Sequence, residues 1–194
     1  MRSMIVFLSL FFFSFVDAAP LPKEFTALLA RAKMTFKIPA EMVSVAPKEN
    51  RAMNYDVAYK HKKEKFEVRF AVRPLDDYFK DYEAKKNDKN MVMIPPNNLY
   101  PSFFQVTALN IGISVDLEKA VLFPPEAVKK EFRADWGATI TVTANKVFGG
   151  GYTWCCLVMI HKNDCGEGYI FFMADDKEVL TREMEKVFDQ LKFK

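Results

Sequence analysis

Three side chains that could do chemistry lie within five positions of one another, at His161, Asp164 and Cys165. An imidazole, a carboxylate and a thiolate in one turn could ligate zinc, or the imidazole could activate the thiol as a nucleophile. A structural zinc site normally takes four ligands, and a histidine that ends a strand before an Asn-Asp turn needs no metal. A thiol- or metal-dependent enzyme built on these residues is therefore the alternative function, and we expect no catalytic residue, metal or cofactor.

Two further motifs resemble chemical sites. Gly149, Gly150 and Gly151 could cradle a phosphate, but strand-like sequence follows them, and neither nucleotide-binding glycine pattern is present. We interpret them as a flexible hairpin loop. Asp76 and Asp77 are adjacent carboxylates in the first turn of a predicted helix, where the helix dipole favours negative charge. Neither motif predicts catalysis.

These residues must be positioned by a sheet near the C-terminus. Residues 138–144, 152–161 and 169–174 have strand-like composition and are separated by glycine-containing loops, which predicts a three-stranded antiparallel meander. The second and third runs are apolar without alternation, as in strands that are covered on both faces. An apolar helix predicted at 99–113 and a C-terminal helix at 175–191, which opens on a capping box, would supply the covers.

Smaller elements are predicted around this centre. They are a helix at 21–33, short strands at 34–39 and 41–46, a hairpin at 54–60 and 65–73, and helices at 75–86 and 124–132. In the hairpin, apolar residues alternate with charged residues, so we expect one of its faces to lie in water. The sequence thus predicts an α+β fold, an antiparallel β-sheet covered by helices, in a single domain from 19 to 194.

Three stretches carry a resemblance to a known family. They are KMTFKIPAEMV at 33–43, RADWGATITVT at 133–143 and GYIFFMADDKEV at 168–179, in an element order of helix, hairpin, helical insertion, meander and C-terminal helix. In these stretches and this order the chain resembles the Mog1/PsbP-like superfamily of α/β/α sandwiches. The resemblance implies a non-catalytic binding or assembly role, because such proteins act by docking to larger partners.

The N-terminus predicts export. Arg2 precedes an apolar run at 4–16, and Val16-Asp17-Ala18 fits a signal-peptidase site. The run is shorter than the ~20 residues of a membrane-spanning helix. We therefore expect a signal peptide at 1–18 that is cut after Ala18, a secreted or periplasmic mature protein, and no integral membrane segment after cleavage.

The net charge and the cysteines limit the possible partners and the means by which the fold is stabilised. A formal net charge of +3 is too mild to indicate a nucleic-acid partner. Cys155 and Cys156 are strand neighbours whose side chains point to opposite faces, and Cys165 lies in the following turn. We expect two buried thiols, an exposed free thiol at Cys165 and no disulfide framework, so burial must hold the fold together.

An apolar stretch at 91–94 lies between polar residues and a proline pair in a predicted surface loop. Unless it folds back on the core, this stretch is a partner-binding patch. We expect the contact surface to combine it with exposed aromatic and charged residues near the meander; the predicted binding residues are Met91, Met93, Ile94, Arg133, Asp135, Trp136 and Tyr152. The predicted function is an exported, non-catalytic binding or assembly module for an unknown protein partner.

Overall fold

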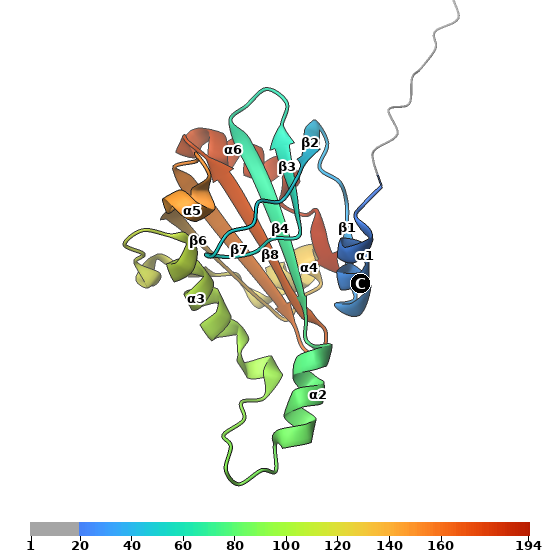
Figure 1. The fold of residues 1–194 in the computed structure, drawn as a ribbon. Coiled ribbons are helices and arrows are strands. Elements are labelled where there is room, and N and C mark those ends of the chain that lie inside the picture. The colour runs from blue at the N-terminus through green and yellow to red at the C-terminus, as the bar shows by residue number, and fades with distance from the viewer. Residues whose placement is uncertain (1–19) are drawn as a thin grey trace, which may run out of the picture.

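The computed structural model describes residues 20–194 (Figure 1). The predicted signal peptide and its cleavage site after Ala18 lie outside these residues. Within 20–194, no helix combines the length and the apolar character that crossing a bilayer requires.

A seven-stranded antiparallel sheet forms the centre of the fold, which confirms the predicted α+β class. In spatial order its strands are β2 (Met42–Val45), β3 (Val57–His61), β4 (Phe66–Pro74), β8 (Gly166–Ala174), β7 (Trp154–Lys162), β6 (Trp136–Thr143) and β5 (Val121–Leu122). The predicted meander is β6, β7 and β8. The predicted hairpin is β3 and β4, and β4 joins the meander by pairing with the whole of β8. Every residue of β8 is buried, because it has a strand at each edge and a cover on each face.

One face of the sheet is covered by three helices and a small second sheet (Figure 1). The helices are α1 (Lys23–Arg31), α4 (Pro125–Phe132) and α6 (Lys177–Val187). The small sheet pairs β1 (Met34–Phe36) with the C-terminal β9 (Leu191–Phe193). The predicted C-terminal helix therefore ends earlier than expected, because the chain turns after Val187 to add this strand.

The opposite face is covered by α3 (Tyr100–Ile111) and the short α5 (Lys146–Gly149). The predicted glycine loop thus begins with a helical turn, which starts where the Asn145 side chain accepts a hydrogen bond from the Phe148 backbone N–H at 2.8 Å. Gly150 ends the turn in the left-handed conformation, at φ 60°, which favours glycine. The expectation that one face of the β3–β4 hairpin lies in water is wrong, since α5 and the segment before β3 pack over it.

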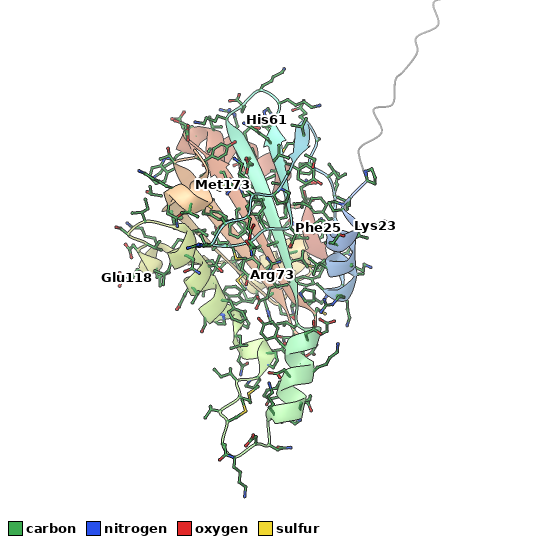
Figure 2. All side chains as sticks on the ribbon, viewed as in Figure 1. Lys23, Phe25, His61, Arg73, Glu118 and Met173 are labelled. Carbon is green, nitrogen blue, oxygen red and sulfur yellow. The ribbon has the colours of Figure 1, made fainter. Side chains whose placement is uncertain are left out.

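A helical arm, residues 76–98, projects from one end of the sandwich (Figure 1). It consists of α2 (Asp76–Lys85), a loop and the 3₁₀ turn η1 (Pro96–Asn98); a second such turn, η2 (Leu117–Lys119), lies before β5. None of the described residues of α2 is buried. Figure 2 shows most of the arm's side chains pointing into solvent, whereas those of the sheet lie between the covers; Pro96 of η1 is buried.

Candidate functional site

Four side chains form a row across the sheet at the end where the arm begins. The strand register pairs Trp136 with His161, His161 with Glu167, and Glu167 with Arg73. Paired residues of neighbouring antiparallel strands point to the same face. The row therefore places a carboxyl group between an imidazole and a guanidinium, beneath α3.

Glu167 is the central residue of this row. Its side chain is almost fully buried, with 1% of the residue exposed. The Tyr169 hydroxyl donates a hydrogen bond to Glu167 Oε2 at 2.6 Å, while Oε1 has no hydrogen-bond partner among residues 20–194. Burial raises the pKa of Glu167 to about 7, although the hydrogen bond from Tyr169 and the charge of Arg73 act in the opposite direction. Glu167 is therefore a buried acid with one carboxyl oxygen, Oε1, that has no hydrogen-bond partner in the described part of the chain.

His161 lies beside Glu167 and is also fully buried. Its Nε2 lies 3.1 Å from Asn163 Oδ1, an acceptor, so Nε2 carries the ring proton. Nδ1 is then an acceptor, 3.9 Å from Glu167 Oε1 and too far for a hydrogen bond. Burial lowers the pKa of His161, and the ring packs on Tyr100 of α3 with centroids 4.4 Å apart. The imidazole is therefore held neutral behind the carboxyl group.

Arg73 flanks Glu167 on the other side, but its guanidinium bonds to different groups. Its Nη1 lies 2.9 Å and 3.1 Å from the two carboxylate oxygens of Asp56. Its Nη2 donates to the Asn54 carbonyl oxygen at 2.7 Å. Asp56 therefore balances the charge of Arg73, and Glu167 is left without a salt-bridge partner.

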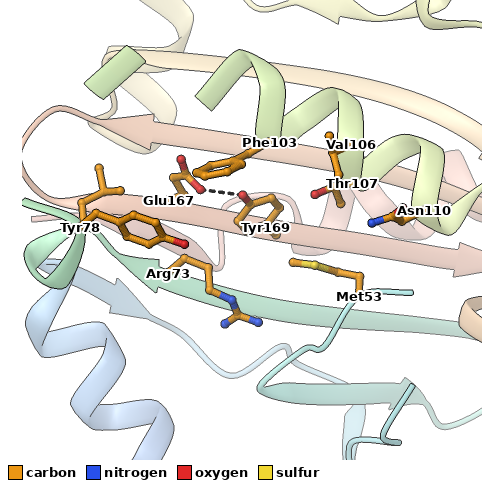
Figure 3. Close-up of a pocket in the computed structure, with 10 residues that line it drawn as sticks. Met53, Arg73, Tyr78, Phe103, Val106, Thr107, Asn110, Glu167 and Tyr169 are labelled. Carbon is orange, nitrogen blue, oxygen red and sulfur yellow. Dashed lines mark hydrogen bonds between the residues drawn. The ribbon is translucent and has the colours of Figure 1, made fainter. Parts of the chain in front are cut away.

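Glu167 lines a partly enclosed cavity of about 230 Å³ at the root of the arm. The cavity lies between the sheet, the start of α2 and one side of α3 (Figure 3). Its other lining residues are Met53, Arg73, Leu75, Tyr78, Phe103, Val106, Thr107, Asn110 and Tyr169. Such a mixture of apolar walls with a few convergent polar groups is typical of small-molecule sites.

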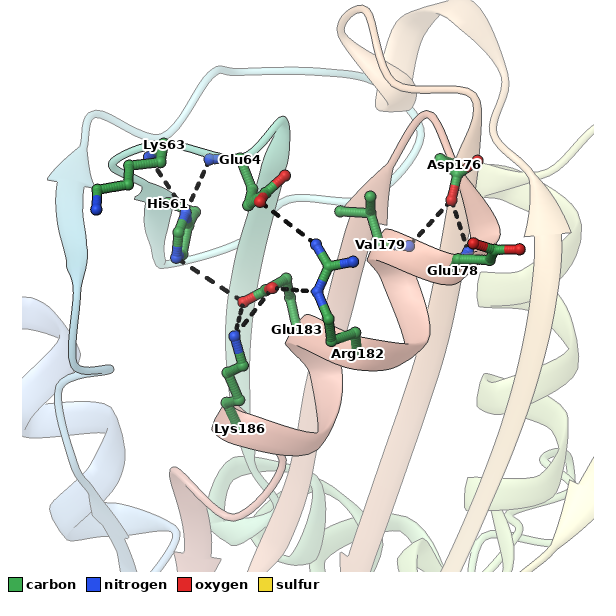
Figure 4. Close-up of polar contacts among 9 residues, drawn as sticks. All are labelled: His61, Lys63, Glu64, Asp176, Glu178, Val179, Arg182, Glu183 and Lys186. Carbon is green, nitrogen blue, oxygen red and sulfur yellow. Dashed lines mark hydrogen bonds and ion pairs between the residues drawn. The ribbon is translucent and has the colours of Figure 1, made fainter.

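A second buried carboxylate, Glu183 of α6, has all the partners that Glu167 lacks. Lys186 Nζ lies 2.8 Å and 3.0 Å from its two oxygens, and Arg182 Nε donates to Oε1 at 2.9 Å (Figure 4). Burial would raise the pKa of Glu183, but Lys186 and Arg182 outweigh burial and lower it. Arg182 also pairs with Glu64 in the β3–β4 turn. This cluster is therefore satisfied, and it ties that turn to α6.

The structure separates the three residues of the predicted H-x-x-D-C site. His161 packs under α3, whereas Cys165 lies in the hydrophobic core on the opposite face of the sheet. Asp164 accepts a hydrogen bond from Asn97 Nδ2 at 2.9 Å. In the described part of the chain, no group of three or more His, Cys, Asp or Glu side chains is arranged to hold a metal ion.

The predictions about the burial of the three cysteines are partly correct. All three are free, and the expected burial of Cys155 and Cys156 is confirmed. The expectation of an exposed thiol at Cys165 is wrong, because that residue is only 6% exposed. The turn folds Cys165 inward between β7 and β8, where its carbonyl oxygen accepts a hydrogen bond from the Leu75 N–H at 3.2 Å.

The predicted binding residues lie in two places. Met91, Ile94, Arg133 and Asp135 are exposed, while Met93 and Trp136 are partly buried. The residues at 91–94 lie in the arm, whereas Arg133 and Asp135 come just before Trp136, which pairs with His161 at the end of the sheet where the arm begins. Trp136 packs against Tyr100, with ring centroids 4.8 Å apart. Tyr152 lies before the far end of β7 and is buried, with 8% exposed. Tyr152 therefore shares no surface with the arm.

Sequence reasoning missed the cavity and its central residues, Glu167, Tyr169 and Arg73. One signal was present, since Glu167 is the only charged residue in the run GEGYIFFMA at 166–174, which is otherwise composed as a strand covered on both faces. A charge in such a strand must find partners or occupy a site. No protein-family model and no curated protein matches this chain.

Proposed function

We propose that this protein is an exported, non-catalytic binding protein that docks on a larger protein partner through the tip of the helical arm. The observation that carries the proposal is the exposure of an apolar tip: Met91 is 46%, Val92 96% and Ile94 55% exposed. Exposing three neighbouring apolar side chains on a projecting loop costs solvation free energy. A partner surface that covers them would recover it.

The arm is anchored at both of its ends, so its tip is presented from a fixed base. At the start of α2, Arg31 of α1 contacts both carboxylate oxygens of Asp76, at 2.6 Å and 2.9 Å, and also pairs with Asp77. At the end of the arm, the side chain of Asn97 accepts a hydrogen bond from the Asp164 N–H at 3.0 Å. A pre-positioned loop loses less conformational freedom when a partner binds.

The charges near the tip favour a protein over an anionic lipid surface. Lys85 pairs with Asp81, and Lys86 pairs with Glu83 at 2.6 Å, so two lysines at the end of α2 are balanced within the helix. Binding to an anionic membrane depends on unbalanced lysine and arginine side chains. The apolar residues therefore dominate recognition at the tip.

Export is the second part of the proposal. It is supported by the order of Arg2, the apolar run at 4–16 and the small residue Ala18 in the sequence. The partner would then be met outside the cytoplasm. The resemblance to the Mog1/PsbP-like superfamily supports the docking role, because it implies a protein that binds to larger partners.

Aspartate substitutions at two exposed apolar sites, one in the tip and one on α5, test the arm. The double variant Met91→Asp, Val92→Asp places two charges in the apolar tip, and Val147→Asp places one on α5, where Val147 is 62% exposed. Residues 19–194 of each protein are immobilised and used to capture partners from the exported fraction of the source cells. We expect the tip variant to lose a partner that both the wild type and Val147→Asp retain, with its melting temperature unchanged. Equal capture by the wild type and the tip variant would reject the arm as the docking element.

A further inference from the structure

The turn that joins β3 to β4 is rich in lysine. Residues 60–65 read KHKKEK, so four of these six positions are lysines. The turn projects from the end of the molecule opposite the arm, and the docking proposal does not use it (Figure 1). Its lysines at 60, 62 and 63 are all exposed. Like charges at this density repel one another unless a counter-charge lies close to them.

The ion pairs around the turn leave these three lysines without a counter-charge. Lys65 pairs with Asp175, and Glu64 pairs with Arg182 of α6. Within residues 20–194, no ion pair involves the other three lysines of the turn. Glu41, which is exposed beside the turn at the start of β2, offsets one of them. Two net positive charges therefore remain at this end of the molecule.

Hydrogen bonds fix the shape of the turn. His61 Nδ1 accepts hydrogen bonds from the backbone N–H groups of Lys63, at 3.2 Å, and Glu64, at 2.9 Å (Figure 4). The Lys62 N–H donates to the carbonyl oxygen of Glu41 at 3.3 Å, which ties the turn to β2. The side chain of Lys63 points away from the polar cluster on α6 in Figure 4. A turn that is already formed loses little backbone freedom when its lysines bind a partner.

The residues beside the lysines favour a lipid surface as that partner. Val43 of β2 pairs with Lys60 across the sheet, so their side chains share a face, and Val43 is 45% exposed. Peripheral membrane sites combine basic side chains with apolar ones that enter the boundary between headgroups and acyl chains. Single-stranded nucleic acid is held instead by aromatic rings that stack on its bases. The aromatic residues that flank the turn, Tyr59 and Phe66, are buried.

We propose that the β3–β4 turn binds the anionic headgroups of a lipid bilayer, with Lys60, Lys62 and Lys63 on the headgroups and Val43 entering between them. Each positive charge near an anionic bilayer raises the affinity about fivefold. Two net charges therefore give a preference of about twentyfold for anionic over neutral vesicles. Because the arm lies at the opposite end of the molecule, its tip then points away from the bilayer (Figure 1).

Co-sedimentation of residues 19–194 with lipid vesicles tests the proposal. One set of vesicles contains phosphatidylglycerol and phosphatidylcholine in equal parts, and the other contains phosphatidylcholine alone. We expect about twentyfold tighter binding to the anionic vesicles at low salt, and an affinity that falls as salt is added, because exposed charges are screened. Equal binding to both sets, or binding to neither, overturns the proposal. Equally tight binding to a single-stranded oligonucleotide would assign the lysines to nucleic acid and also overturn it.

A matched pair of double variants locates the binding. Lys62→Gln, Lys63→Gln removes two positive charges from the turn, so we expect about tenfold or greater loss of affinity for the anionic vesicles. Lys129→Gln, Lys130→Gln removes two exposed charges from α4 and leaves the affinity unchanged. An equal loss in the two double variants would mean that net charge alone drives the binding, which contradicts a site at the turn.

A tryptophan at position 43 reports on the apolar contact. The fluorescence of Val43→Trp should shift to the blue when anionic vesicles are added, whereas that of Leu109→Trp, at a site 52% exposed on α3, should not. The native tryptophans are common to both variants. An unshifted Val43→Trp would leave this side chain in water and contradict the proposal. The vesicle assays contain no partner protein, so their result is independent of the docking experiment.

Discussion

Arg69 of β4 donates a hydrogen bond from Nη1 to the backbone carbonyl oxygen of Phe148, 79 residues later in the chain. Its Nε donates to Glu67 Oε1 at 2.6 Å. Its guanidinium carbon lies 4.9 Å from the centroid of the Tyr55 ring and 5.0 Å from that of Phe148. One buried arginine thus joins the first hairpin, the segment before it and α5.

Truncation of this arginine should strongly destabilise the fold. Arg69→Ala leaves Glu67 without its partner and the carbonyl oxygen of Phe148 without its donor, so we expect the free energy of unfolding to fall by about 3–5 kcal/mol. Urea denaturation followed by circular dichroism measures it. The double variant Arg69→Met, Glu67→Met removes both charges and should be more stable than Arg69→Ala. A cost below about 1 kcal/mol for Arg69→Ala would show that water solvates this pair.

Glu167 should make stability depend on pH. Its pKa in the folded protein is about 7, above the ordinary value of 4.5. Between these two values the folded state keeps a proton that the unfolded state has released, so the stabilising contribution of Glu167 is fully present below pH 4.5 and is lost as the pH rises through 7. The shift corresponds to about 3 kcal/mol.

Glu167→Gln isolates this contribution, because glutamine is the uncharged isostere of the protonated acid. We expect the free energy of unfolding of the variant relative to the wild type to increase between about pH 4.5 and pH 7 and to stay constant above that. His161, whose pKa is lowered by burial, makes an opposite contribution at lower pH, but it is present in both proteins. Parallel urea titrations at several pH values measure the difference. A difference that does not change with pH would mean that Glu167 is solvated.

The three thiols should be unreactive in the folded protein. Burial raises the pKa of the Cys155 and Cys156 thiols, and Cys165 is enclosed by the core under α1. We expect a thiol-specific reagent such as dithionitrobenzoate to label the native protein slowly and to label all three cysteines in denaturant. Rapid labelling of Cys165 in the native protein would restore the exposed thiol and, with it, the thiol-enzyme alternative.

The large elements could be predicted from the sequence because their signals are local. The uninterrupted apolar runs of β7 and β8 indicate double coverage, and the capping sequence at Asp176 marks the start of α6, where its side chain accepts hydrogen bonds from the N–H groups of Glu178 and Val179. The apolar content of residues 99–113 alone predicts α3. In each case the pattern and the final environment agree.

The errors arise where a distant partner decides the environment. Alternating charges in β4 predict a solvated face, but Glu67 and Asp56 neutralise Arg69 and Arg73. Arg69 therefore lies beneath a cover that its own sequence does not reveal, and Arg73 is partly buried. The position of Cys165 in a turn predicts a solvated thiol, because turns are usually exposed. The cavity around Glu167 required the register of β4, β8 and β7, which no single stretch of sequence contains.

The C-terminal strand β9 also depends on a distant partner, and its contribution to stability can be tested by substitution. It has only three residues, and it exists because Leu191 and Phe193 pair with Phe36 and Met34 at the other end of the chain. Both side chains are fully buried, whereas Lys192 between them points outward and pairs with Asp189 at 3.2 Å. The strand therefore closes the core over β8.

Phe193→Ala should lower the free energy of unfolding by about 3–5 kcal/mol, since it removes a buried ring and leaves a cavity. Lys192→Ala, the adjacent control, removes only an exposed ion pair and should cost less than about 1 kcal/mol. Urea denaturation of the two variants beside the wild type gives both numbers. Similar small losses in both would mean that the last residues are frayed in solution, and β9 would then not be part of the folded core.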